Sequence, residues 1–309
     1  MVKINWGDIK MIRKKRLESN IIGIGKNPDE KAALREALGY LPIQSLVDNT
    51  TTVTIIANLV NINPPNKGVV VGGETLRELI RYIKSKNPKR LVVAGGAGGA
   101  NTLDVLKSNG YDVILNQEQV EFIDLNFGEY FDLELQHSIV KSTKINKIIK
   151  ESDVLISFTQ LKVHEEATMS ASIKNMALSL PPAEIHGYPK KSLGIHEDLH
   201  GFIYAMAKEI PIDLAIVSLS PAMIGTGPSK GVAVHTDMLI AGLDAVAVDT
   251  ICARLLGFRP QAINYLFRLI KDGIGQANFD NIDIKGVKLI DAEKAFSKIA
   301  YGSEFSVDE

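Results

Sequence analysis

Short apolar runs alternate along this chain with segments of helical periodicity. The runs of strand type lie at residues 53–59, 90–94 and 154–158. Between the first two, apolar side chains recur at every third or fourth position over residues 74–86, which predicts a helix. This alternation is typical of βαβ units. We therefore predict an α/β fold, with a largely parallel or mixed sheet and helices on both faces.

The remaining elements are predicted from the same patterns. Residues 117–145 are predicted to form a short β-hairpin or an excursion from the sheet. Further strands are expected at residues 113–115, 213–220 and 238–241, and further helices from about residue 102 and near 197–209, 245–256 and 261–272. Two organisations stay open: residues 1–309 as a single compact α/β unit, or two lobes of residues 1–150 and 151–309.

Charge and hydropathy restrict the partners and the location. The formal net charge of -1 argues against a general nucleic-acid binder. The basic run 10–16 is interpreted as a solvated helix face. No uninterrupted apolar run is long enough to span a bilayer, and the chain does not open on an apolar signal-peptide core. We expect a cytoplasmic protein without a membrane or nucleic-acid partner, and its oligomeric state stays open.

Cys252 is the single cysteine of the chain. One cysteine cannot supply the four ligands of an iron–sulfur cluster within the chain. Cys252 lies in an apolar helical run and is interpreted as a buried, inert thiol. The cofactor is otherwise unknown from the sequence.

The strongest candidate site follows the apolar run at 154–158. Its cationic and hydrogen-bonding residues are Lys162, His164, Thr168, Lys174 and Asn175. If the strand continues, Lys162, His164 and Glu166 share one face. A strand that opens into such residues favours a site for a small anionic molecule. The alternative is a surface loop with a solvated lysine.

Two glycine-rich runs are weaker candidates. In residues 225–231, Gly225 and Gly227 free backbone amides that could hold an oxyanion, and Lys230 adds charge. A tight loop without a ligand is the alternative there. The run 95–99 follows a strand, but Asn101 stands where a dinucleotide fingerprint needs its third glycine.

Two further segments carry alternative interpretations. His196 and His200 match a zinc-peptidase spacing, but Gly201 weakens the helix and no third ligand is evident, so His200 alone is the better binding candidate. Asp244 is predicted to cap the helix 245–256. Asp249 lies inside that apolar helix and is expected to need a cationic partner such as Lys162 or Lys174. It is either a structural ion pair or a member of the active site.

Several of these blocks together resemble the family known as domain of unknown function 362. The resemblance rests on residues 57–59, 161–164 with 172–175, 199–200 with 211–214, 223–231, 241–249 and 273–275. It implies a cytoplasmic α/β protein of prokaryotic type whose chemistry is unsettled. Many relatives carry ferredoxin-like cysteine motifs, which this chain lacks. It also has Ile56-Ala57 where the family usually has lysine-proline, and no acidic residue near 218–220.

Three functions follow from these residues. The leading hypothesis is an enzyme that acts on a small carboxylate or phosphate metabolite by proton transfer. In it, Lys162, Lys174 and the loop 225–231 hold the anion, and His164 is the acid or base. Asn58 and Asn175 orient the substrate, while Asp249 fixes a lysine. The second hypothesis is an accessory protein that holds an anionic ligand or cofactor without turnover. The third is a metal-dependent hydrolase that uses His196 and His200.

Overall fold

A ten-stranded sheet runs through the centre of the computed structural model, which describes residues 12–307. Its main order is β12-β1-β11-β9-β7-β2-β3-β4, with β8 paired to β7 and β10 paired to β9. These strands are β1 (Ile21–Lys26), β2 (Thr52–Ala57), β3 (Arg90–Gly95), β4 (Glu121–Asp124), β7 (Val154–His164), β8 (Thr168–Ser170), β9 (Leu214–Ile224), β10 (Val232–Val234), β11 (Met238–Gly242) and β12 (Asp283–Gly286). The predicted α/β fold is confirmed.

The strand order reverses between β2 and β7. From β2 the chain moves outward to β3 and then β4, and it returns to place β7 on the other side of β2, followed by β9. Each neighbouring pair from β9 to β4 is parallel, whereas β11 is antiparallel to both of its neighbours. In sheets of this kind, ligands bind outside the carboxyl ends of the strands where the order reverses. The topology therefore indicates the carboxyl ends of β2 and β7 as the expected place for a ligand.

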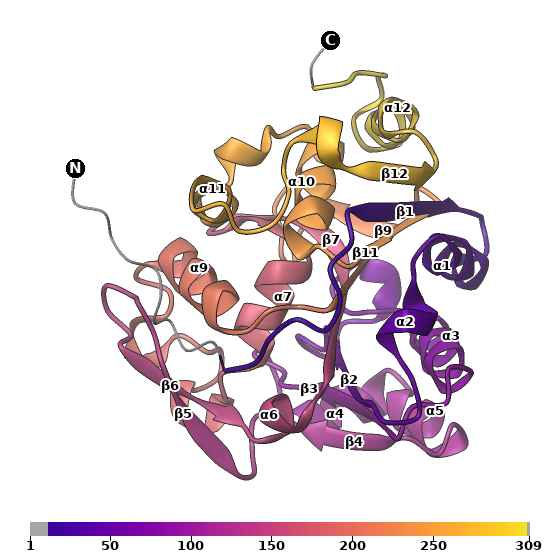
Figure 1. The fold of residues 1–309 in the computed structure, drawn as a ribbon. Helices are drawn as coiled ribbons and strands as arrows, with labels where there is room; N and C mark the ends of the chain where they lie inside the picture. The colour runs from indigo at the N-terminus through magenta and orange to yellow at the C-terminus, as the bar shows by residue number, and fades with distance from the viewer. Residues whose placement is uncertain (1–11, 308–309) are drawn as a thin grey trace.

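Helices cover both faces of the sheet (Figure 1). One core packs with α1 (Glu30–Gly39), α2 (Ile43–Leu46), α3 (Gly73–Lys84), α4 (Thr102–Ser108) and α5 (Tyr111–Gln117). The other packs with α6 (Ile148–Glu151), α7 (Ser172–Ser179), α9 (Leu199–Glu209), α10 (Ala245–Leu255), α11 (Asn264–Lys271) and α12 (Leu289–Tyr301). Side chains alternate along each strand, so Ile55 joins the first core and Ile56 the second. The remaining short helix is α8 (Ala183–His186), and the 3₁₀ turns are η1 (Pro65–Lys67), η2 (Ser192–Gly194), η3 (Pro260–Ala262) and η4 (Phe279–Asn281).

The observed elements correct one sequence-based prediction and confirm another. The strand predicted at 113–115 is wrong, because these residues lie within α5. Three apolar residues are too short a run to separate a strand from a helix. The β-hairpin predicted in the segment 117–145 is confirmed, because β5 (Tyr130–Glu134) pairs with β6 (Ser142–Asn146) as a separate antiparallel hairpin, while β4 joins the main sheet. Strands from both sides of residue 150 share the main sheet, and the division into two lobes stays a prediction.

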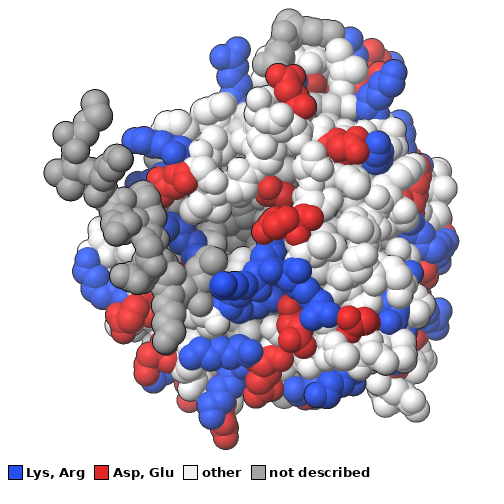
Figure 2. Space-filling model, viewed as in Figure 1, with Lys and Arg blue, Asp and Glu red and all other residues white. Residues whose placement is uncertain are grey.

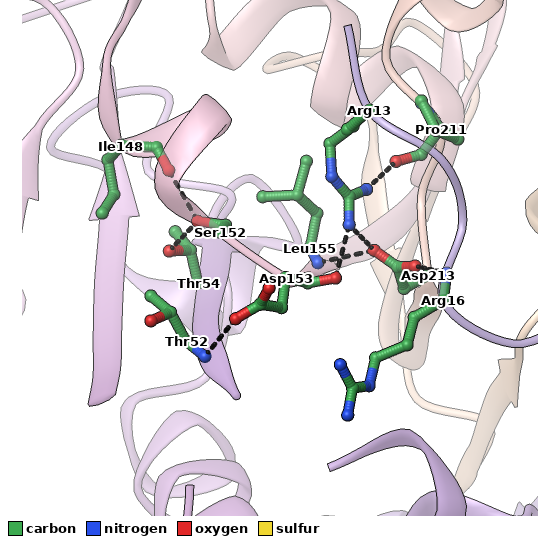
Figure 3. Close-up of polar contacts among 10 residues, drawn as sticks. All are labelled: Arg13, Arg16, Thr52, Thr54, Ile148, Ser152, Asp153, Leu155, Pro211 and Asp213. Atoms are coloured by element: carbon green, nitrogen blue, oxygen red, sulfur yellow. Dashed lines mark hydrogen bonds and ion pairs between the residues drawn. The ribbon is translucent and has the colours of Figure 1, made fainter. Parts of the chain in front are cut away.

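The basic N-terminal run is not a helix in the part that the structure describes. Residues 12–20 are irregular, and residues 10 and 11 lie outside the described range. Arg13 crosses the amino edge of the sheet, where its guanidinium lies 2.6 Å from the fully buried Asp213 and donates to the carbonyl oxygens of Pro211 and Asp153 (Figure 3). An irregular path allows Arg13 to satisfy a buried carboxylate, which a solvated helix face could not do.

The surface and the helices bear on the expected partners. Lysine, arginine, aspartate and glutamate are interspersed over the face shown in Figure 2, which has a hollow near its centre. In the described range, no helix is both long enough and apolar enough to cross a bilayer. Cys252 is fully buried in α10, as predicted for an inert thiol.

Candidate functional site

A cavity of about 360 Å³ opens at the carboxyl ends of β2, β3 and β7. Five of the predicted site residues line it: Asn58, Lys162, His164, Lys174 and Asn175. The other polar and charged residues of the lining are Asn61, Glu165, Glu166, Ser170, Ser179, Lys190, Lys191, His196 and Ser229. Four lysines and two glutamates thus face the same space. The cavity lies at the reversal of strand order, where the topology favours a ligand.

Strand β7 continues beyond the run visible in the sequence and carries two of these side chains. It ends at His164, and its terminal part pairs with β8, with Lys162 opposite Ser170 and His164 opposite Thr168. The pairing of β7 with β9 is irregular between Gln160 and Lys162. Such irregularities often occur beside functional sites, where they redirect a side chain. Lys162 and His164 lie two residues apart on this strand, whereas Glu166 lies in the turn after it, so the expected shared strand face extends only to His164; all three residues line the cavity.

Lys162 is buried and has few hydrogen-bond partners. When the Asn58 carboxamide is oriented so that its nitrogen donates to the carbonyl of Val69, its oxygen accepts from Lys162 Nζ at 3.2 Å. Burial, together with the nearby charge of Lys174, lowers the pKa of Lys162 to about 7. A substantial fraction of this amine is therefore neutral at neutral pH.

Lys174 extends into the cavity from α7. It is half-buried, and burial lowers its pKa to about 8, whereas the charge of Glu166 acts in the opposite direction. Among residues 12–307, no carboxylate is within ion-pair distance of Lys174. Lys174 is therefore a cation that a bound anion can stabilise.

Asp249 does not pair with either lysine, and that expectation is wrong. Its carboxylate accepts from Ser172 N at 2.9 Å, from Ser172 Oγ at 2.6 Å and from Ile173 N at 3.2 Å. Burial raises the pKa of Asp249 to about 7, although these hydrogen bonds oppose the shift. The donors at the amino end of α7 replace the expected lysine. Asp249 does not line the cavity, but it fixes the helix that carries Lys174.

Lys190 was missed by the sequence analysis. Its Nζ donates to the carbonyl oxygens of Gly96 at 2.9 Å, Leu178 at 3.2 Å and Ser179 at 3.2 Å. Burial lowers its pKa to about 7, with the charge of Asp124 in opposition. Its three carbonyl partners come from two segments that are distant from Lys190 in sequence, so no local pattern could reveal them. These three acceptors match the three N–H groups of an ammonium, so Lys190 links its own loop to both of these segments in the wall of the cavity.

His164 is held as a neutral ring. Its Nδ1 accepts from the backbone N–H groups of Glu166 and Ala167, each at 3.1 Å. The ring proton therefore resides on Nε2. Burial, followed by the charges of Lys174 and Lys162, lowers the pKa of His164 to about 2. This arrangement suits a hydrogen-bond donor, while the predicted acid or base role stays a prediction.

A second histidine lies at the cavity beside a carboxylate. His196 Nδ1 is 2.5 Å from Glu166 Oε2, and Lys191 Nζ is 3.0 Å from Glu166 Oε1. Burial lowers the pKa of His196, whereas the hydrogen bond to Glu166 acts to raise it. A carboxylate on Nδ1 orients the ring and leaves Nε2 to exchange a proton with another group. The two residues are 30 positions apart, so the sequence pattern indicated His196 only as a possible metal ligand.

The two predicted asparagines differ in their available groups. Asn175 Nδ2 donates to the Ile56 carbonyl at 3.2 Å and to Ser157 Oγ at 3.0 Å, so the amide ties α7 to β2 and β7. The side-chain oxygen of Asn175 accepts a hydrogen bond from Ser179 Oγ at 3.3 Å. Asn58 instead directs its oxygen toward Lys162. Both line the cavity, and their substrate-orienting roles stay predictions.

The structure does not bring the other predicted residues to the cavity lining. They are Thr168, His200, Gly225, Gly227, Lys230 and Asp249. The glycine loop reaches the cavity through Pro228 and Ser229 instead, and the glycine run after β3 contributes Gly96, Gly98 and Gly99. A side chain at Gly227 would place Cβ 1.8 Å from the Val163 carbonyl oxygen, so glycine permits the close packing of this loop on β7.

The predicted metal ligands do not converge. His196 contacts Glu166. His200 Nδ1 instead accepts from Tyr265 N at 3.3 Å, and the rings of His200 and Tyr265 stack with their centroids 5.8 Å apart. In the part of the chain that the structure describes, no three histidine, cysteine, aspartate or glutamate side chains are grouped to hold a metal ion. The third ligand that zinc chemistry needs is not supplied by this geometry.

Fold and cavity together define an α/β protein with a lysine-lined cavity at the reversal of its strand order. The chain belongs to the family described as domain of unknown function (DUF362), whose pattern matches residues 53–254. The thylakoid-associated protein sll1697 of Synechocystis sp. is 23% identical over 212 residues, which cover 68% of this chain and 64% of that protein. The lactate racemase apoprotein of Thermoanaerobacterium thermosaccharolyticum aligns with a TM-score of 0.44 and 18% identity, over 74% of this chain and 54% of that one. This chain thus spans less than two thirds of each.

Proposed function

We propose that this protein is an enzyme that binds a small anionic metabolite in the cavity and acts on it by proton transfer. The ligand carries a carboxylate or a phosphate. The observation that carries the proposal is that Lys162 and Lys174 face one cavity, and no carboxylate among residues 12–307 forms an ion pair with either. A cation in a desolvated site is costly without a counter-charge. A bound anion supplies that charge.

Four polar residues of the cavity have roles in this proposal. Lys174 pairs with the anion, and the Nε2–H of His164 donates a hydrogen bond to it. His196, oriented by Glu166, transfers the proton. A dyad of this kind contributes about 10²–10⁴-fold to the rate of a proton-transfer step. His164 thereby binds, and His196 acts as the acid or base.

Proton uptake on binding tests the anion site. An anion beside Lys174 raises its pKa from about 8, so binding near that pH draws a proton from the buffer. We expect calorimetric titrations with phosphate, succinate and pyruvate to give enthalpies that depend on the ionisation enthalpy of the buffer. Lys174→Met removes this dependence and weakens binding. Tight binding by wild type without proton uptake contradicts the role of Lys174.

Turnover distinguishes the enzyme from an accessory protein that only holds the ligand. The anion that co-purifies with the protein is identified by mass spectrometry and then incubated with the protein in D₂O. An enzyme of this class incorporates deuterium at the reacting carbon, and His196→Gln abolishes the exchange while binding persists. Binding without exchange by wild type favours the accessory protein.

A further inference from the structure

The two most buried lysines of the cavity differ in how many acceptors they meet. Lys190 Nζ has three carbonyl acceptors, one for each N–H of an ammonium. Among the described residues, Lys162 Nζ has one, the carboxamide oxygen of Asn58 at 3.2 Å. A buried N–H without an acceptor is destabilising, because it loses its hydrogen bond to water without replacement. The surroundings of Lys162 therefore offer fewer acceptors to an ammonium than those of Lys190 do, and they favour a neutral amine with a free lone pair.

The position of Lys162 makes this amine accessible to a ligand. It projects from the end of β7 into the same cavity as Lys174, and the charge of Lys174 contributes to the low pKa of Lys162. The two lysines are thus close but in different environments, because Lys174 is half-buried on α7. Lys174 can hold a carboxylate at the more open side while Lys162 meets the adjacent carbon. A desolvated lysine beside another cation is an activated nucleophile toward carbonyl compounds.

We propose that Lys162 forms an imine with the carbonyl carbon of a 2-oxo acid whose carboxylate pairs with Lys174. The proposal rests on the proposed function in requiring that the cavity bind a small anion, and it identifies the substrate class. The cavity of about 360 Å³ accommodates a compact oxo acid.

The step balances without an oxidant or a reductant. The lone pair of Lys162 Nζ forms a C–N bond while the carbonyl π pair moves to oxygen, which takes one proton from nitrogen. The carbinolamine then loses water: the C–O bond breaks, the C=N bond forms, and the second hydrogen of Nζ leaves with the oxygen. The resulting imine is an electron sink for removal of a proton from the neighbouring carbon.

Reductive trapping tests the imine in the wild-type protein. The protein is incubated with pyruvate, glyoxylate or 2-oxoglutarate, reduced with borohydride, digested and mapped by mass spectrometry. We expect the Lys162 peptide to gain the mass of the oxo acid less one oxygen. Acetone, which has a carbonyl but no carboxylate, and acetate, which has no reactive carbonyl, should leave it unlabelled. This mapping needs no variant that might fail to fold.

Variants add a second readout. Lys162→Arg keeps a long basic side chain but removes the nucleophilic amine, so trapping is lost. Lys144→Arg is the matched control, because Lys144 is exposed on the β5–β6 hairpin and pairs with Asp132, and trapping at Lys162 should be unchanged.

The outcomes separate this proposal from the proposed function. Labelling at Lys174, at Lys190 or at no lysine, while calorimetry shows that the oxo acids bind, overturns the imine and leaves the anion site standing. Binding of phosphate or succinate without any oxo-acid adduct has the same meaning. If none of these anions binds, both proposals are overturned.

Discussion

Glu166 Oε2 lies 2.5 Å from Nδ1 of His196, while the other oxygen of the same carboxylate contacts Lys191. One carboxylate thus both orients a histidine ring at the cavity and neutralises a lysine. The two neighbours have opposite effects on the ring, because Glu166 acts to raise the pKa of His196 and Lys191 acts to lower it.

Substitution of these neighbours should therefore shift the histidine in opposite directions. Glu166→Gln removes the negative charge and is expected to lower the pKa of His196, whereas Lys191→Gln is expected to raise it. Nuclear magnetic resonance titration of the His196 ring measures both shifts. Shifts in the same direction would show that the dyad does not control the protonation of this ring.

His164 offers a test in which its two ring nitrogens are separated. His164→Asn keeps an acceptor near the Nδ1 position for the backbone N–H groups of Glu166 and Ala167 but loses the Nε2–H donor. Loss of a hydrogen bond to a charged group costs about 1.5–3 kcal/mol, so affinity for phosphate or succinate should fall by roughly tenfold or more.

Its companion, His164→Gln, keeps a donor at the Nε2 end but leaves the two N–H groups unpaired, at about 1–3 kcal/mol each in unfolding free energy. Urea denaturation and calorimetry separate the two effects. In wild type, with the pKa lowered to about 2, the ring should not titrate between about pH 5 and 8. A titration in that interval would contradict the neutral-donor role.

The low pKa of Lys162 predicts how stability depends on pH. The folded protein releases this proton near pH 7, whereas the unfolded chain holds it up to its ordinary value of 10.5. Between these values the unfolded state binds more protons, so the unfolding free energy gains up to about 1.4 kcal/mol per pH unit from this residue as pH rises. Below about pH 7 the contribution is lost.

Lys162→Met removes that contribution and should flatten the rise, while the contributions of Lys174 and Lys190 persist. The measurement is urea denaturation at a series of pH values. An unchanged slope in the variant would show that Lys162 is charged throughout in the folded protein.

Asp249 and Asp244 provide a matched pair for the stability of α10 and α7. Asp244 caps its own helix through Val246 N and Ala247 N and also accepts from Gln276 N, but these contacts are only part-buried, so its replacement by alanine should cost about 0.5–2 kcal/mol. Asp249→Ala leaves three buried donors of Ser172 and Ile173 without an acceptor and should cost more, at about 1–3 kcal/mol for each.

Asp249→Asn retains an acceptor and should lie between the alanine variant and wild type in unfolding free energy, as urea denaturation can show. Equal costs for Asp249→Ala and Asp244→Ala would mean that the amino end of α7 finds other partners.

The periodic part of the fold could be predicted from the sequence, because apolar spacing reflects which faces are buried. The strand β1 could not be predicted, because Gly23 and Gly25 interrupt its apolar pattern. Their role is tertiary: a Cβ on Gly23 would lie 2.2 Å from the Ala37 carbonyl oxygen, and one on Gly25 would lie 2.1 Å from that of Ala33. Glycine there allows α1 to pack on the strand, and nothing local in the sequence indicates this contact.

The candidate site likewise contains residues that the sequence reveals and residues that only the folded structure reveals. Lys162 and His164 could be found because they follow a recognisable strand with the spacing of one face. Lys190 and the pairing of Glu166 with His196 depend on contacts between segments far apart in sequence. Asp249 was recognised as a buried charge in need of a partner, but both a lysine and a helix amino end satisfy a carboxylate. Sequence spacing does not distinguish these two solutions.

The hydrogen bonds of Asp249 determine which fragments of the chain can form the cavity. The amino end of α7 is held by a residue 77 positions later, in a helix on the far side of β9 and β11 in chain order. A fragment that stops before α10 retains every residue that lines the cavity yet lacks the group that anchors the helix of Lys174. Complementation between two co-expressed halves, rather than expression of the first half alone, is the way to recover a working cavity from pieces.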